Sequence, residues 1–155
     1  MEDKINIIKL SKQLLLNNID FFIKLGKDII PRELQYWDKE HYLLEVDGKW
    51  DYSFCCILEE KLMGFLICTK KSEKNFVHIN KMAISKEYRS LKIGSKMLAT
   101  LKNTCLNNNI DAISSFTNKK NEGALNFYLK HGFQIEDIIK DETTERYYMI
   151  HKIKV

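Results

Sequence analysis

The chain has 155 residues, of which 45% are hydrophobic and 30% are charged. This is the size of one ordinary domain, so we expect a single domain over residues 1–155 that needs neither disulfides nor a metal for stability. No apolar run approaches the roughly 18 residues of a membrane span. The start, Met1 to Lys4, is acidic and unlike a signal peptide. We therefore expect a cytoplasmic protein that is not embedded in a membrane.

The formal net charge is +4, from 25 basic and 21 acidic residues. An excess of this size leaves a nucleic-acid partner open. Charges of both signs are interspersed along the chain, however, and no stripe of alternating aromatic and basic residues is evident. This pattern favours an ordinary solvated surface over a nucleic-acid interface.

The four cysteines are Cys55, Cys56, Cys68 and Cys105, each among Phe, Ile and Leu residues. Their spacing matches no zinc site and the histidines are scattered, so we expect no metal. Apolar surroundings are typical of buried, reduced thiols. A nucleophilic cysteine would need a basic neighbour, and the sequence supplies none.

The first third of the chain predicts one strand and two helices. Residues 3–10 alternate weakly and indicate a strand. Residues 13–30 carry Leu, Ile and Phe at helical spacing, with Ser11 as N-cap, and indicate one long helix. Pro31 separates this helix from a second one, expected over residues 32–44.

The middle of the chain predicts strands. Residues 52–58 and 61–69 are rich in β-formers, and the polar pair Glu59-Glu60 between them indicates a hairpin. Residues 75–84 indicate a third strand. Strict alternation would divide its side chains between two faces. These two sets are His78, Asn80 and Met82, and Val77, Ile79, Lys81 and Ala83.

From Ile93 the apolar spacing becomes helical, and this helix is expected to end near Asn107. Gly132 is expected to cap a later, shorter helix. The remaining elements, a strand, that helix and two strands, are predicted at 110–116, 124–129, 133–139 and 146–153. The order β-α-α-β-β-β-α-β-α-β-β predicts an α/β (α+β) fold with a mixed sheet flanked by helices.

The segment from Met82 to Ser95 runs from a strand through a tight loop into a helix. The free N–H groups at a helix start carry about half a positive charge and bind phosphate. Gly94 permits close approach of a ligand, and Arg89 and Lys92 add charge. The alternative is an ordinary strand-to-helix turn with solvated basic side chains.

This segment resembles the acetyl-CoA loop of the GNAT superfamily (Gcn5-related N-acetyltransferases). That loop follows a strand ending in Ala-Val or Ala-Ile and reads Arg/Gln-x-x-Gly-x-Gly/Ala. Here Ala83 and Ile84 end the strand, Arg89 fills the first loop position and Gly94 the last. Lys92 replaces the first glycine, and a lysine at positive φ costs about 1 kcal/mol.

A second segment, residues 121–133, resembles the Asn-x-x-Ala-x-x-x-Tyr-x-x-x-Gly-Phe helix of the same family. The spacing agrees at Asn121, Ala124, Tyr128, Gly132 and Phe133. The resemblance extends over about residues 75–153. It implies a GNAT-like fold, with a mostly antiparallel central sheet of about seven strands and about four helices.

The resemblance also implies a reaction, in which an acetyl group passes from acetyl-CoA directly to a primary amine in a ternary complex, without an acyl-enzyme. It implies Tyr128 as the acid for the leaving thiolate and His78 as the base for the incoming amine. A core tyrosine and a hydrogen-bonded strand histidine are the alternatives. The implied cosubstrate-binding residues are Met82, Ala83, Ile84, Arg89, Ser90, Lys92, Ile93, Gly94, Ser95, Asn121 and Tyr128.

The acceptor stays open between a small-molecule amine and a peptide amine, and a homodimer is also left open. Tyr36, Trp37, Tyr42 and Trp50 lie where the family builds its acceptor pocket, but they suit a core equally. Two other functions remain. One is a non-catalytic acyl-CoA-binding sensor module, which Lys92 and the unassigned base would allow. The other is an acetyltransferase acting on aminoacyl-tRNA.

Overall fold

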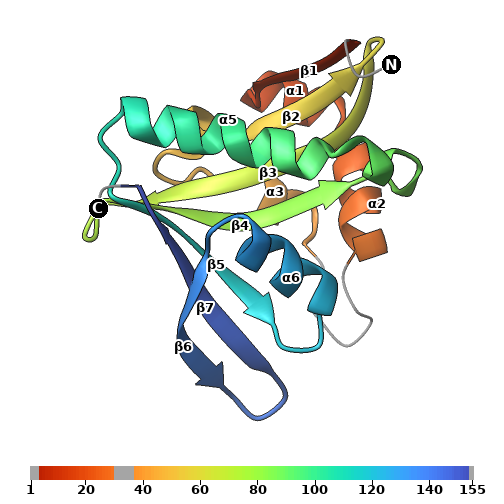
Figure 1. Cartoon of the computed structure of the whole chain (residues 1–155). Helices are drawn as coiled ribbons and strands as arrows, with labels where there is room; N and C mark the ends of the chain where they lie inside the picture. The colour runs from red at the N-terminus through yellow and green to blue at the C-terminus, as the bar shows by residue number, and fades with distance from the viewer. Residues whose placement is uncertain (1–3, 30–36, 154–155) are drawn as a thin grey trace.

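A computed structural model of the chain describes residues 4–29 and 37–153. Seven strands form one sheet with helices on both faces (Figure 1), as the predicted α/β fold requires. The elements in chain order are β1 Ile5–Lys9, α1 Lys12–Asn17, α2 Ile19–Ile29, α3 Lys39–Leu43, α4 Lys49–Tyr52, β2 Phe54–Leu58, β3 Lys61–Lys71, β4 Phe76–Ile84, the 3-10 helix η2 Lys86–Leu91, α5 Ile93–Asn107, β5 Ala112–Asn118, α6 Glu122–Lys130, β6 Gln134–Lys140 and β7 Glu145–Lys152.

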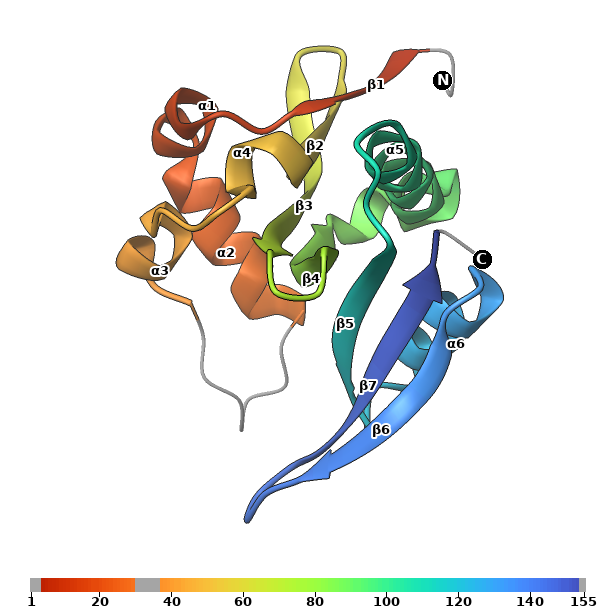
Figure 2. The ribbon, with the colours of Figure 1, turned by 90° about the vertical axis from the view of Figure 1, so that its left-hand side faces the viewer.

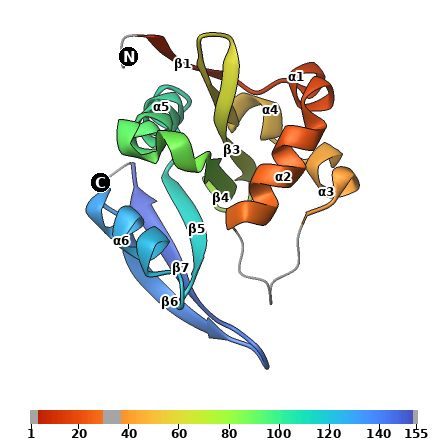
Figure 3. The same cartoon turned by 90° about the vertical axis from the view of Figure 1, so that its right-hand side faces the viewer.

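The strand order is β1-β2-β3-β4-β5-β7-β6, and every neighbouring pair is antiparallel except β4 and β5. Helices α5 and α6 cover one face of the sheet, and α1, α2 and α3 cover part of the other (Figures 2 and 3). Each face has its own apolar core. The predicted mixed, mostly antiparallel sheet is confirmed.

The long helix predicted over residues 13–30 is two helices. Ser11 caps α1 as predicted, its hydroxyl accepting from the Leu14 N–H at 3.1 Å. Asn18 then breaks the helix, because its side-chain amide donates to the Leu14 carbonyl at 2.9 Å and competes with the backbone. The single-helix prediction was wrong for this reason.

The helix predicted over residues 32–44 lies partly outside the described residues, and Pro31 and Tyr36 lie wholly outside them. Within the described part, α3 covers only Lys39–Leu43. The sequence did not predict the short α4, which occupies the start of the strand expected at 52–58. The described residues therefore hold six α-helices rather than about four.

The hairpin and the helix cap were predicted correctly. Glu59 and Glu60 have φ of 49° and 67°, so both central residues of the β2–β3 turn are left-handed. This conformation matches the twist of a two-residue hairpin. Gly132 follows α6 with φ of 90°, as a left-handed cap residue does.

A β-bulge changes the faces of β4. Ile67 of β3 pairs with Lys81, but the next residue, Cys68, pairs with Ile79, so Asn80 has no opposite partner. The extra residue reverses the alternation. Met82 therefore lies on the α5 face with Ile79, and Lys81 lies on the opposite face. The strict alternation expected from the sequence was wrong.

Candidate active site

Strands β4 and β5 diverge within the sheet. Their parallel pairing runs from Phe76 and Ala112 to Ile79 and Ser115 and then stops. Beyond that point β4 pairs only with β3 and β5 only with β7, so a gap opens between them (Figures 1 and 3). Backbone N–H and C=O groups of residues 80–84 on this edge lack β5 partners, and such an edge pairs readily with an extended ligand.

The loop after β4 leads helix α5 to the mouth of this gap. Lys92 ends η2 and precedes α5 with φ of 57° and ψ of 33°, the left-handed conformation that the sequence had put in question. The first bond of α5 joins the Lys96 N–H to the Lys92 carbonyl at 3.1 Å. The amides of Ile93, Gly94 and Ser95 therefore lack helical carbonyl partners and can receive an anion.

Gly94 and Arg89 hold the loop against the end of β4. A Cβ on Gly94 would lie 3.2 Å from Ile84 Cδ1 and 3.4 Å from the Phe127 ring. The glycine thus lets α5 pack closely on β4 and α6, in addition to any approach of a ligand. Arg89 Nε donates to the Ile84 carbonyl at 3.2 Å, and Ser90 lies in η2.

The Ser95 hydroxyl is engaged by His131, a contact that the sequence did not predict. His131 Nδ1 lies 2.8 Å from the Phe127 carbonyl and donates to it, and its Nε2 lies 2.9 Å from Ser95 Oγ. The hydroxyl of Ser95 thus has a partner within the protein, while its backbone N–H can still be offered to an anion.

Tyr128 lies on α6, inside the core on the α5 face, and is 5% exposed. Burial raises the pKa of its phenol to about 12, against a smaller lowering by a hydrogen bond with Ser115. Tyr128 therefore stays protonated at neutral pH and can donate a hydrogen bond. Asn121 caps the same helix, its side-chain oxygen accepting from the Ala124 N–H at 3.1 Å.

His78 lies on the opposite face of the sheet. Its Nδ1 is 2.8 Å from Ser114 Oγ, and its ring stands edge-on to Phe116. Ser114 and Ser115 are neighbours on β5, so their side chains point to opposite faces. His78 and Tyr128 thus flank the point where β4 and β5 separate, one from each face.

Burial, together with the charges of Lys71 and Arg146, lowers the pKa of His78 to about 4. The imidazole is therefore neutral at physiological pH. Its pKa is well below the ordinary value of about 6.5 on which the sequence-based interpretation as a base relied.

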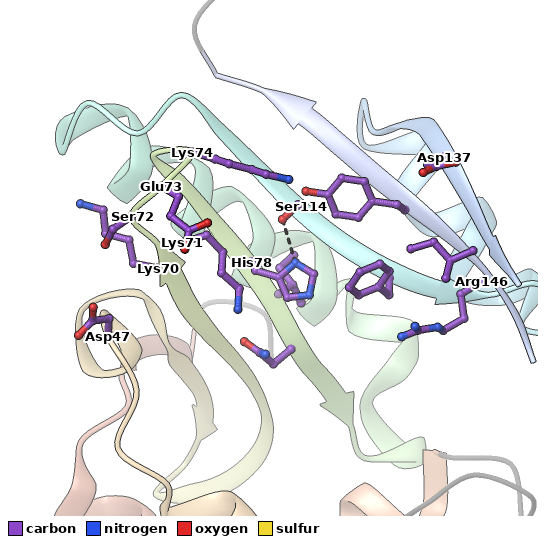
Figure 4. Close-up of a pocket in the computed structure, with 15 residues that line it drawn as sticks. Asp47, Lys70, Lys71, Ser72, Glu73, Lys74, His78, Ser114, Asp137 and Arg146 are labelled. Carbon is purple, nitrogen blue, oxygen red and sulfur yellow. Dashed lines mark hydrogen bonds between the residues drawn. The ribbon is translucent and has the colours of Figure 1, made fainter. Parts of the chain in front are cut away.

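A cleft of about 980 Å³ lies on the His78 face (Figure 4). It is built by the end of β3, the turn that follows, strands β4, β5, β6 and β7, and the segment between α3 and α4. Its lining residues are Asp47, Lys70, Lys71, Ser72, Glu73, Lys74, His78, Ile79, Asn80, Ser114, Phe116, Asp137, Ile139, Arg146 and Tyr148. Of these, the sequence had singled out only His78 as a site residue.

Of the aromatic residues proposed for an acceptor pocket, the three that the structure describes, Trp37, Tyr42 and Trp50, do not line this cleft. Tyr42 is fully buried between Phe22 and Phe65, with ring centroids 6.0 Å away on each side. Trp37 packs against Tyr42, and Trp50 donates to a glutamate from its indole nitrogen at 2.9 Å. In this structure Tyr42 belongs to the core, which was the alternative interpretation.

Lys81 is a buried lysine that sequence reasoning missed. It is 8% exposed, and its ammonium lies 4.6 Å from the centre of the Trp37 ring. Burial lowers the pKa of this amine to about 8. The bulge at Asn80 puts Lys81 on the face of the sheet opposite α5, and no sequence pattern predicted that bulge.

The cysteines offer no nucleophile. All four are buried and free, and burial raises the pKa of each thiol above its usual range. They are therefore protonated at neutral pH. Residues 4–29 and 37–153 contain no cluster of metal-binding side chains, and none of their helices is long and apolar enough to cross a membrane.

A sequence profile of the acetyltransferase (GNAT) family matches residues 20–133, which is well over half of the chain. The chain belongs to the GNAT family. The match includes both the loop with Arg89 and Gly94 and the helix that carries Tyr128. The predicted resemblance is therefore confirmed.

Solved structures share the fold along nearly the whole chain. Ard1 from Thermoplasma volcanium has a TM-score of 0.81 at 18% identity, with 96% of this chain and 97% of that chain covered. The ribosomal-protein-S18-alanine N-acetyltransferase from Escherichia coli has a TM-score of 0.79 at 14% identity, covering 97% and 95%. Arabidopsis thaliana Naa50 has a TM-score of 0.75 at 22% identity, covering 95% and 97%. At these identities the likeness concerns the fold.

Proposed function

We propose that this GNAT protein transfers an acetyl group from acetyl-CoA to a primary amine by direct attack in a ternary complex. The observation that carries the proposal is the gap between β4 and β5, which opens beside the free amides at the start of α5. Two similar structures support the choice of cosubstrate. Arabidopsis thaliana Naa50 was solved with the bisubstrate analogue CoA-Ac-MVNAL, and the PaiA N-acetyltransferase from Thermoplasma acidophilum with coenzyme A.

The polar groups around the gap fit coenzyme A. The amides of residues 93–95 would receive the pyrophosphate, with Arg89 and Lys92 supplying positive charge. The unpaired edge of β4 would pair with the amides of the pantetheine arm. Thr117, on the diverging part of β5, has a buried hydroxyl without a hydrogen-bond partner among the described residues. A polar ligand in the gap would satisfy it.

The reaction forms a C–N bond and breaks the thioester C–S bond. A backbone N–H near Met82 or Ala83 would stabilise the negative charge that develops on the carbonyl oxygen. The amine must lose a proton, and neutral His78 is the candidate acceptor, directly or through water. The thiolate leaves toward Tyr128.

Tyr128 acts on the leaving group mainly as a hydrogen-bond donor. The pKa of its phenol is about 12, whereas a simple thiol has a pKa of about 8.5. Full proton transfer from the phenol to the thiolate would therefore be unfavourable. A hydrogen bond from the phenol stabilises the thiolate until it takes up the proton that the amine has released.

The test combines acetyl-CoA binding by calorimetry with a thiol-release assay across amine classes, including peptide N-termini, amino acids and polyamines. We expect binding, and release with at least one class. If acetyl-CoA binds but no amine releases thiol, the protein is an acyl-CoA-binding sensor module instead. If acetyl-CoA does not bind at millimolar concentration, both functions are excluded.

A further inference from the structure

Charged side chains are unevenly distributed in the cleft on the His78 face. Lys71 and Arg146 extend toward His78 from β3 and β7, and Asp47 and Asp137 lie toward the two ends (Figure 4). The remaining charged lining residues are Lys70, Glu73 and Lys74, from the end of β3 and the turn that follows it. The centre of the cleft, where a group must lie to reach the gap, is therefore positively charged.

Arg146 is held in place but has an unsatisfied donor. Its guanidinium carbon lies 4.6 Å from the centre of the Phe116 ring, and the same ring is 5.1 Å from the His78 ring. Its Nε is buried and has no hydrogen-bond partner among the described residues. Neither Arg146 nor Lys71 forms an ion pair within that part of the chain. A half-buried guanidinium that packs on an aromatic ring, with a buried Nε that lacks a hydrogen-bond partner among the described residues, is suited to binding an oxyanion.

We propose that the acceptor amine carries an oxyanion, a carboxylate or a phosphate, which Arg146 binds together with Lys71. This inference rests on the proposed acetyltransferase function and names its substrate class. The planar fork of arginine matches both anions in a bidentate geometry, with Lys71 adding a point charge. A polycationic acceptor would instead be repelled at the centre of the cleft.

The anion of such an acceptor would also raise the pKa of His78, the candidate base. Burial is the main cause of the low pKa of His78, and the two cations that would bind the anion lower it further. An anion between them offsets this effect, because a nearby negative charge favours the imidazolium. His78 then accepts a proton more readily when the correct acceptor is present, so the anion affects turnover as well as binding.

The experiment measures kcat/KM for matched acceptor pairs with acetyl-CoA. Free amino acids are compared with their carboxamides, and phosphoethanolamine with ethanolamine, to distinguish the two anions. Spermidine represents the polycations. A hydrogen bond to a charged group contributes enough for about 10- to 100-fold discrimination. We expect at least one anionic member to exceed its neutral partner by this factor and spermidine to be poor.

Three variants assign the preference to its residues. Arg146→Gln should reduce the ratio within a pair to about 3-fold or less, while Arg146→Lys keeps part of it, since the charge remains but the fork is lost. Lys71→Gln, at an exposed position, should lower the ratio less. Lys140→Gln is the matched control, because Lys140 lies on the same hairpin as Arg146 but does not line the cleft.

The outcomes separate the inference from the proposed function. Thiol release with equal kcat/KM for both members of every pair, or with spermidine preferred, overturns the inference and leaves the acetyltransferase intact. A ratio that persists in both Arg146→Gln and Lys71→Gln overturns the assignment to this cleft. Absence of acetyl-CoA binding, or of release with every amine, overturns the proposed function and the inference with it.

Discussion

The two faces of the sheet differ in chemistry where β4 and β5 separate. On the α5 and α6 face, Tyr128 lies in an apolar core, and the nearby polar groups are largely backbone amides at a helix start. On the other face, His78 lies in a cleft with seven charged lining residues. Under the proposed function, the apolar surroundings of Tyr128 would strengthen the hydrogen bonds made near the thioester. The charged cleft would select the acceptor.

This comparison predicts the largest effect at Tyr128. If the Tyr128 phenol stabilises the leaving thiolate, Tyr128→Phe should lower kcat about 100-fold or more. The affinity for acetyl-CoA, measured by calorimetry, should change little. Tyr52→Phe is the control, because Tyr52 is a buried tyrosine of the same core cluster. A normal kcat for Tyr128→Phe would contradict a role for Tyr128 in the departure of the thiolate.

The charged face predicts a pH dependence of stability. The folded pKa of His78, about 4, is below its unfolded value, so the unfolded chain binds more protons between the two values. The contribution of His78 is therefore complete above about pH 6.5 and is lost as the pH falls to about 4, a change of about 3 kcal/mol. Urea unfolding of wild type and His78→Gln from pH 7 to 4 measures it. Parallel curves for the two proteins would contradict the low pKa.

The low pKa of His78 also predicts the position of the acid limb in the pH profile of kcat/KM. Because kcat/KM reports the free enzyme, this limb should lie near the pKa of His78, at about 4, and not near 6.5. Arg146→Gln removes one of the depressing charges and should move the limb upward. Since activity at low pH also requires a folded protein, circular dichroism at each pH provides the control.

A smaller effect concerns how the His78 face is packed beneath α2. A Cβ on Gly26 would overlap the Tyr42 hydroxyl and lie 3.2 Å from Lys81 Cε. Gly26→Ala should therefore destabilise the protein by about 1–3 kcal/mol in urea unfolding. Gly123→Ala on α6, whose Cβ would meet only Asn121 Oδ1 at 3.8 Å, should be neutral or stabilising. Equal effects of both would contradict the close packing at Gly26.

The smallest change in stability is expected for a substitution of Lys92, in the loop before α5. Lys92→Gly relieves the left-handed conformation and should raise stability by about 1 kcal/mol in thermal or urea unfolding. If the ammonium also contacts phosphate, affinity for coenzyme A should fall several-fold in the same variant. Unchanged or improved affinity would exclude that contact.

Local patterns explain why the loop and the helix that carry the family resemblance could be predicted from the sequence. The loop with Arg89 and Gly94, and the helix with Tyr128, each occupy a short contiguous segment whose spacing indicates its structure. The order of strands and helices along the chain near them followed from the same patterns. These features depend on neighbours in sequence, which a single chain displays directly.

The charged cleft could not be predicted in this way. Its residues come from strands that are distant in sequence, and Arg146 reaches His78 only because β7 pairs with β5. The bulge at Asn80 decides which face carries Lys81, yet asparagine in a strand does not indicate a bulge. The low pKa of His78 likewise depends on side chains that folding brings together. Tertiary contacts of this kind leave no local pattern.

The most direct test of the central claim is a crystal structure of the protein with coenzyme A. We expect the diphosphate on the amides of residues 93–95, the pantetheine arm along the β4 edge, and the sulfur between His78 and Tyr128. A nucleotide bound elsewhere, or an arm that avoids the gap between β4 and β5, would contradict the account.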